Sequence, residues 1–144
     1  MTHEFSGHYA AKHPPGAEPD SRIAEAVKAG AKDGKVSCAA AHRIATDMGV
    51  HPSEVGKTMD LLEFRIVKCQ LGLFGYQPNK KVVEPAETVS LELRDALTAA
   101  LVDDRLPCKS AWRIADRFGI TRMAVASACE KMNLRVSPCQ LGAF

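Results

Sequence analysis

The chain has 144 residues, of which 46% are hydrophobic and 25% are charged, a balance typical of a folded globular protein. Its formal net charge is only +2, and no apolar run approaches the roughly 20 residues of a membrane-spanning helix, so polyanion binding by bulk charge and membrane insertion are both disfavoured. Five cysteines are an odd number, which argues against a disulfide framework.

Residues 1–19 are expected to form a flexible N-terminal tail. They contain three histidines and three prolines, but no apolar segment of the kind that directs secretion. Together with the odd number of cysteines, this composition predicts a cytoplasmic protein with reduced thiols.

Residues 20–74 recur without a gap as residues 90–144, and residues 75–89 form the linker between the two copies. Identical residues at this offset of 70 positions include Cys38 and Cys108, Arg43 and Arg113, Gly49 and Gly119, and Cys69 and Cys139. Both copies close on Cys-Gln-Leu-Gly-x-Phe, in which we expect the leucine and phenylalanine to be buried. A duplicated module is typical of a protein that binds a target with two matching halves, or that packs against its own copy.

Three helices are predicted in each copy. In copy one they cover residues 23–30, 38–48 and 52–64, and in copy two residues 93–101, 111–118 and 122–134, because apolar residues recur there at helical spacing. Ser21 is expected to cap the first helix. Gly49 and Gly119 follow the second helix directly, where a left-handed glycine ends a helix and turns the chain.

Short strands are predicted after the third helix of each copy, at residues 65–69 and 135–139. Gly72 or Gly142 then makes a turn, and in copy one residues 81–83 are expected to return as the second strand of a hairpin. The predicted architecture is therefore mainly α, with two tandem trihelical repeats and short β-hairpins.

In both copies, the second helix, the glycine that follows it and the third helix together resemble a known protein family. The residues concerned are Ile44, Ala45, Met48, Gly49, Val50 and Val55, and Ile114, Ala115, Phe118, Gly119, Ile120 and Val125. This pattern resembles the helix-turn-helix family, and the strands after the third helix resemble those of its winged variant. The resemblance implies a DNA-binding transcriptional regulator whose two linked copies imitate a dimer on double-stranded DNA.

The resemblance also indicates which side chains would meet DNA. The third-helix positions that it places against the major groove are His51, Ser53, Lys57, Thr121, Arg122 and Ser127. Asp60 and Glu130 would repel the DNA backbone. Arg43 and Arg113, on the second helix, would contact flanking phosphates, although they would equally fit exposed helix arginines or an ion pair between the copies. An alternative remains open, in which the third helix is simply a packed amphipathic helix of a protein-interaction domain or a homo-oligomer.

The cysteines suggest another interpretation. Cys38 and Cys69, and likewise Cys108 and Cys139, are expected to be neighbours within each copy, and four thiolates would suit zinc or an iron-sulfur cluster. We favour core packing for all four and for Cys129, and expect no cofactor, but a metal or redox sensor stays open as the alternative. The sequence contains no phosphate loop, nucleophile-base pair or paired-carboxylate pattern, so we expect no enzyme activity and no catalytic residue.

Overall fold

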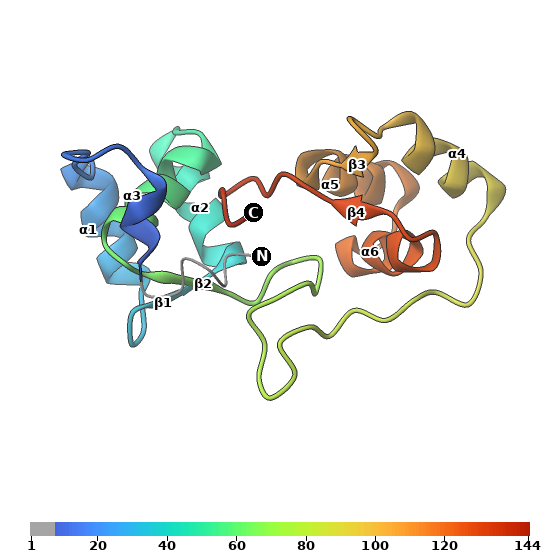
Figure 1. Ribbon diagram of the computed structural model, residues 1–144, viewed down its shortest axis with the longest axis horizontal. Helices are drawn as coiled ribbons and strands as arrows, with labels where there is room; N and C mark the ends of the chain where they lie inside the picture. The colour runs from blue at the N-terminus through green and yellow to red at the C-terminus, as the bar shows by residue number, and fades with distance from the viewer. Residues whose placement is uncertain (1–7) are drawn as a thin grey trace. The chain divides into compact units, whose positions relative to one another are not determined.

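The computed structural model describes residues 8–144, and this part of the chain is mainly helical (Figure 1). Its six α-helices are α1 (Ser21–Gly30), α2 (Cys38–Met48), α3 (Pro52–Leu61), α4 (Leu91–Ala99), α5 (Cys108–Phe118) and α6 (Arg122–Lys131). The prediction of a mainly α protein is therefore confirmed. Within residues 8–144, no helix is long and apolar enough to cross a membrane.

Polar capping residues define where most of these helices begin. The carboxylate of Asp20 accepts hydrogen bonds from the backbone N–H groups of Arg22 and Ile23, at 2.9 and 3.1 Å. The cap of α1 is therefore Asp20, one residue before the predicted Ser21. The third helices end three residues earlier than predicted, because Glu63 and Asn133 adopt positive φ angles of 58° and 57° that no helix continues through.

The two predicted glycine turns are present, with nearly identical geometry. Gly49 has φ 65° and ψ 32°, and Gly119 has φ 65° and ψ 31°. The N–H group of each glycine bonds back to the carbonyl oxygens at the end of the preceding helix. A side chain at either position would meet no neighbouring atom, so the requirement for glycine comes from the backbone conformation alone.

Replacing Gly119 with alanine should therefore lower the free energy of unfolding by about 1 kcal/mol. Valine should lower it further because a β-branched side chain tolerates positive φ poorly, while asparagine should be milder than either. Urea unfolding of the full chain measures all three variants. If the valine variant were as stable as the natural chain, the left-handed backbone conformation would not be the reason why this turn requires glycine.

Short parallel strand pairs take the place of the predicted hairpins. β1 (Lys35–Ser37) pairs in parallel with β2 (Arg65–Val67), and β3 (Arg105–Leu106) with β4 (Arg135–Val136) (Figure 1). Each pair is parallel because the two intervening helices return the chain to the start of the first strand. The hairpins predicted in the fold class are therefore wrong, although the strands after α3 and α6 are where the sequence indicated.

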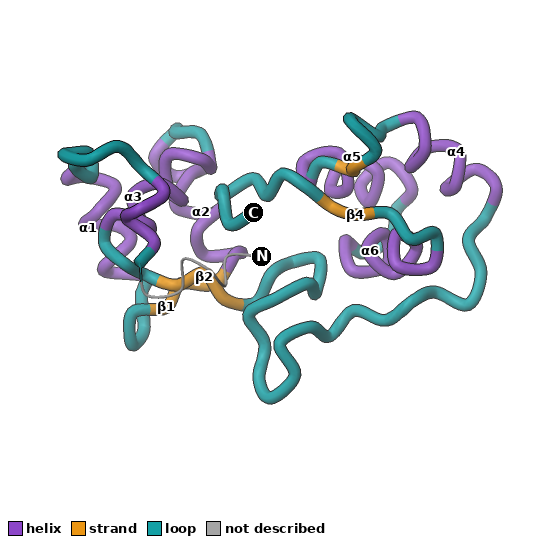
Figure 2. Tube along the Cα trace, viewed as in Figure 1, coloured by secondary structure: helices purple, strands orange, loops and turns teal. Residues whose placement is uncertain are grey.

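The second hairpin strand predicted at residues 81–83 is also absent, and Figure 2 draws the whole segment between β2 and α4 as loop. The N–H groups of Val82 and Val83 both donate to the single carbonyl oxygen of Gly72, at 2.9 and 3.2 Å. Two consecutive donors on one acceptor cannot extend into a strand ladder, whose residues alternate in direction.

The described residues form two compact units whose boundaries differ from those of the sequence repeats. Unit 1 comprises the described residues up to Cys69 together with Leu141–Phe144, and unit 2 comprises Gln70–Gln140. The closing Leu-Gly-x-Phe of each repeat thus belongs to the unit that contains the helices of the other repeat. The linker, residues 75–89, belongs to unit 2.

Each unit has its own core, built from equivalent positions of the two repeats. The buried pairs, each at most 2% exposed, are Val27 and Leu97, Val36 and Leu106, Ala41 and Ala111, Val55 and Val125, and Met59 and Cys129. Full burial of a Val, Leu or Met side chain contributes about 1.5–3 kcal/mol. Since these positions fall on every helix and on one strand of each unit, they hold the three helices around a common centre.

The N-terminal segment departs from the expected flexible tail. Residues Tyr9–Lys12 form a short 3-10 helix, η2, which packs against α3 in unit 1. The carboxylate of Glu63 accepts hydrogen bonds from the N–H groups of Tyr9 and Ala10, at 2.7 and 2.8 Å. The expectation for residues 1–7, including His3, lies outside the described residues.

Candidate functional site

The four predicted DNA-contacting residues of unit 1 are all exposed. Arg43 lies on the outer side of α2, His51 caps the start of α3, and Ser53 and Lys57 follow one helical turn apart on α3. Arg43 and Lys57 take part in no ion pair among residues 8–144. The start of α3 therefore presents a polar surface to solvent, on which the exposed carboxylate of Glu54 offsets the positive charge of Lys57.

His51 is held in a defined orientation by its capping role. Its Nδ1 atom accepts a hydrogen bond from the N–H group of Ser53 at 3.3 Å and lies 2.9 Å from the Ser53 hydroxyl oxygen. Because Nδ1 is the acceptor, the neutral ring carries its proton on Nε2. Nε2 is thus the atom with which this exposed side chain donates to a ligand.

Asp60 does not lie on the exposed surface of α3, which corrects the expectation that it would repel DNA phosphates. Its side chain is 7% exposed and bonds to Lys12 Nζ at 3.1 Å and to His13 Nε2 at 2.9 Å. Since a carboxylate only accepts, His13 donates through Nε2. The negative charge of Asp60 is therefore compensated inside unit 1 by the N-terminal segment.

The corresponding residues of unit 2 are largely engaged within the unit. The guanidinium of Arg122 lies over the ring of Trp112, 3.5 Å from its centroid, and donates to the side-chain oxygen of Gln70 at 3.3 Å. A cation stacked on an indole and bonded to an amide is positioned for packing rather than for reading bases. Arg122, unlike Lys57, is only half-exposed.

Other predicted residues of unit 2 fall into two groups. Ser127 is half-buried and its carbonyl oxygen accepts from the N–H group of Ala86 at 3.0 Å, while Glu130 forms an ion pair with Lys81. The linker thus lies along this side of α6. Thr121 and Arg113 are exposed, although the Thr121 hydroxyl is already used to cap α6 at Ala124.

The four repeat cysteines divide into two pairs, one in each unit. Cys38 follows β1 and Cys69 lies two residues after β2, so the parallel register brings both to the same end of the strand pair. In unit 2 the N–H group of Cys108 donates to the carbonyl oxygen of Pro138 at 3.0 Å, and Gln140 Nε2 donates to Cys108 Sγ at 3.4 Å. Residues 8–144 contain no group of three or more histidine, cysteine or carboxylate side chains arranged to hold a metal ion.

Cys129 belongs to the core, as the sequence indicated, and its exposed fraction is 2%. Burial, assisted by the neighbouring Glu130 carboxylate, raises the pKa of the Cys129 thiol to about 11. The folded chain holds this proton more tightly than the unfolded chain, whose thiol has an ordinary pKa of about 8.5. The resulting stabilisation is complete below pH about 8.5 and is lost as the pH rises to about 11.

We therefore expect iodoacetamide at pH about 8.5 to alkylate Cys129 at least about tenfold more slowly than Cys139, because the thiolate is the reacting species. Cys139 is half-buried and serves as the internal reference in the same chain. Peptide mass spectrometry measures both rates, and addition of urea should make them equal. Similar rates in the folded chain would show that the Cys129 thiol is accessible.

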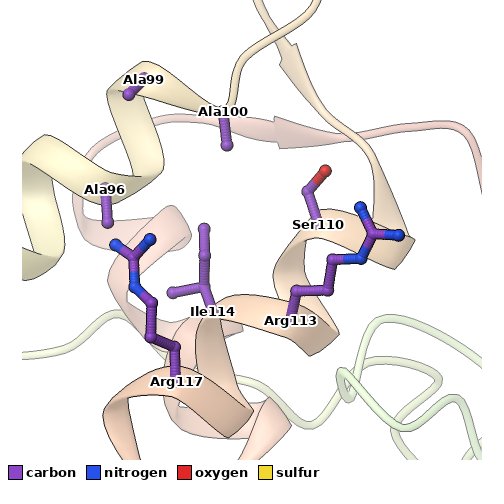
Figure 3. A pocket seen from close by; sticks show the side chains of 7 residues that line it. All are labelled: Ala96, Ala99, Ala100, Ser110, Arg113, Ile114 and Arg117. Atoms are coloured by element: carbon purple, nitrogen blue, oxygen red, sulfur yellow. The ribbon is translucent and has the colours of Figure 1, made fainter.

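One group of residues was missed by the sequence analysis. Ser110 and Arg117 line a cavity in unit 2 together with Arg113, which had been predicted only as a phosphate contact (Figure 3). The available signal was the spacing of Arg113 and Arg117, which are four residues apart on one helix face. The N-terminal Lys12 and His13 were missed for a different reason, since their partner Asp60 is distant in sequence.

Comparison with protein-family models, with curated protein sequences and with solved structures finds no match to this chain. A functional assignment therefore depends on the chemistry of the exposed surfaces themselves. The two strongest are the start of α3 in unit 1 and the arginine-lined cavity in unit 2.

Proposed function

We propose that this chain is a non-enzymatic, DNA-binding transcriptional regulator with two tandem helix-turn-helix repeats, and that unit 1 makes the base contacts. The observation that carries the proposal is the exposed start of α3, which follows α2 through the left-handed turn at Gly49. His51, Ser53 and Lys57 are all exposed there, and Arg43 is exposed on α2.

The chemistry of these side chains suits a duplex. In helix-turn-helix proteins the first residues of the third helix enter the major groove, while the preceding helix crosses the backbone. His51 Nε2 and the Ser53 hydroxyl would donate to base edges, and Arg43 and Lys57 would bind phosphates on either side. The partial positive charge at the start of α3 favours the same polyanion.

The proposal gives the two units unequal roles. In repeat two, Arg122 is the basic residue nearest in sequence to the positions equivalent to Ser53 and Lys57, and its guanidinium stacks on Trp112. We therefore assign to unit 2 only peripheral phosphate contacts, through Thr121 and Arg113, in place of the symmetrical pseudo-dimer that the repeats alone suggest. Ser127 has no part in DNA contact in this scheme, because it is half-buried beside the linker.

Fluorescence anisotropy with a mixed-sequence duplex of about 20 base pairs tests this assignment. Lys57→Ala and Arg43→Ala should each weaken binding several-fold and reduce the slope of log K against log salt by about 0.9, as expected for one lost phosphate contact. Lys131→Ala is the matched control, because it removes an exposed lysine from α6 outside the proposed surface.

Arg122→Ala should leave DNA affinity nearly unchanged while lowering the stability of unit 2 by about 1 kcal/mol, through loss of the stacked contact. Absence of duplex binding at about 50 mM salt, where basic proteins bind most tightly, would reject the proposed function. Equal losses in the Lys57 and Lys131 variants would instead reject the assignment of the site to α3.

A further inference from the structure

Unit 2 contains a cavity of about 320 Å³ between α4 and α5 (Figure 3). Its apolar wall consists of Ile114 on α5 and of small side chains from the end of α4, among them Ala96 and Ala100. Ala100 directly follows the last residue of α4, and its small side chain leaves the space above Ile114 open.

Two guanidinium groups flank this apolar wall. Arg113 and Arg117 are one helical turn apart on α5, and Figure 3 shows their guanidinium groups on opposite sides of Ile114. The hydroxyl of Ser110 lies on the Arg113 side of the cavity (Figure 3). Both arginines are exposed, and neither takes part in an ion pair among residues 8–144. The Arg117 guanidinium lies over the ring of the neighbouring Phe118, 5.1 Å from its centroid, a longer contact than the 3.5 Å stacking of Arg122 on Trp112.

This combination selects a particular class of ligand. A guanidinium presents planar, paired donors that match the oxygens of a phosphate or carboxylate, and two of them compensate two negative charges. Ser110 adds a further donor, and Ile114 with the alanines provides apolar surface for a small organic group. We propose that the cavity binds a small organic dianion, with a phosphomonoester as the best match.

Repeat one shows which of these residues the fold itself does not need. The positions that correspond to Arg113 and Ile114 are Arg43 and Ile44, but those of Ser110 and Arg117 are Ala40 and Asp47. The two arginine charges of unit 2 are therefore replaced by one positive and one negative charge in unit 1. Since both units form the same three helices, the fold itself requires neither Ser110 nor Arg117.

The inference does not depend on DNA binding: Arg113 is also a peripheral phosphate contact in the proposed function, but the base contacts lie in unit 1, and Ser110 and Arg117 have no DNA contact there. A site for a small anion on unit 2 would make the chain responsive to a phosphorylated or dicarboxylate metabolite. The two proposals can fail separately, since one is measured with a duplex and the other with a small probe.

Titration of the full chain with phenyl phosphate, followed by nuclear magnetic resonance, tests the proposal. We expect saturable shifts at Ser110 and Ile114, with no equivalent response at Ala40 and Ile44. Benzyl alcohol, which has a similar ring but no charge, should bind at least about tenfold more weakly, because it forms no charge-assisted hydrogen bonds. Inorganic phosphate should also bind more weakly, because it does not use the apolar wall.

Arg117→Asp introduces the residue that repeat one has at this position, and should weaken phenyl phosphate binding about tenfold or more. Lys109→Asp makes the same charge change on the same helix outside the cavity, and should have a much smaller effect. Arg117→Gln is the second variant if aspartate disturbs folding, which amide dispersion in the same spectra reveals.

Three results would overturn the proposal. One is unchanged affinity in both Arg117 variants, and another is an equal loss in the Lys109 variant, which would indicate general electrostatics. The third is an equal loss of duplex affinity and of phenyl phosphate affinity in the Arg117 variants, which would assign Arg117 to the DNA backbone. If inorganic phosphate bound as tightly as phenyl phosphate, the apolar wall would contribute nothing to affinity, and the proposal of an organic ligand would be wrong.

Discussion

Replacing Gly56 with alanine is expected to lower the free energy of unfolding of unit 1 by about 2 kcal/mol or more. Gly56 lies inside α3, where the backbone of Leu141 packs so closely that an added Cβ atom would overlap the Leu141 carbonyl oxygen. The neighbour is backbone and cannot rotate away, so either α3 or the closing segment must move. Overpacking of a close contact typically costs about 1–3 kcal/mol, and loss of Leu141 burial adds to it.

A truncated chain that ends at Gln140 provides the control for this variant. Without Leu141 the clash is absent, and alanine has a higher helix propensity than glycine by about 1 kcal/mol. Gly56→Ala should therefore be neutral or stabilising in the truncated chain, which reverses the sign of its effect. Ala126, the corresponding residue of α6, already carries a Cβ atom in a buried position, so Ala126→Gly should cost about 1 kcal/mol.

Urea unfolding followed by the amide resonances of each unit measures these changes separately. Hydrogen exchange at Ala143, which is buried in unit 1, reports whether the closing segment has been released. A destabilising effect of equal size in the full and truncated chains would show that the contact with Leu141 is not the cause.

Asp60→Asn is expected to destabilise unit 1 by about 2 kcal/mol. The carboxylate is almost fully buried, and its two partners on the N-terminal segment lose a charged acceptor at once. The loss falls below the range for deeply buried pairs, because Lys12 and His13 are themselves 15% and 20% exposed and can turn toward water. The N-terminal segment should consequently dissociate from α3, with faster exchange at the amides of Tyr9 and Ala10.

Glu130→Gln is the matched control, since Glu130 occupies the equivalent position in repeat two and pairs with Lys81, whose side chain is 51% exposed. Exposed ion pairs contribute about 0–1 kcal/mol, so this variant should change stability by less than about 0.5 kcal/mol. Salt should diminish the small effect at Glu130 and leave the larger effect at Asp60 nearly unchanged. Equal effects of the two substitutions would contradict the buried role of Asp60.

The helices of this chain were predictable because their signals are local. Apolar spacing places α2 and α3 within a few residues of their observed bounds, and the helix-ending glycines at 49 and 119 have the expected left-handed conformation. Strand pairing was not predictable in the same way. Arg65 follows α3 in sequence as a hairpin strand would, but its partner Lys35 lies 30 residues earlier, and no local pattern distinguishes the two arrangements.

In the candidate site, too, local features were predictable from the sequence and long-range contacts were not. The exposure of Ser53 and Lys57 follows from their spacing on an amphipathic helix, which a sequence displays directly. The engagement of Arg122 by Gln70, and of Asp60 by Lys12 and His13, joins residues separated by 47 to 52 positions. The sequence alone does not distinguish a charged side chain that faces water from one that is paired with a side chain distant in the sequence.

The closing segments, residues 70–74 and 140–144, show most clearly what the sequence determined and what the tertiary structure determined. The sequence by itself indicated that Leu71 and Leu141 are buried, as the structure shows, because a leucine side chain gains about 2 kcal/mol when it leaves water. Only the tertiary structure decided where: Leu141 is buried in unit 1 against Gly56, and Leu71 belongs to unit 2. The tendency of a leucine to be buried comes from its own side chain, whereas the surface that buries it depends on backbone shape, such as the space left by the missing Cβ atom of Gly56.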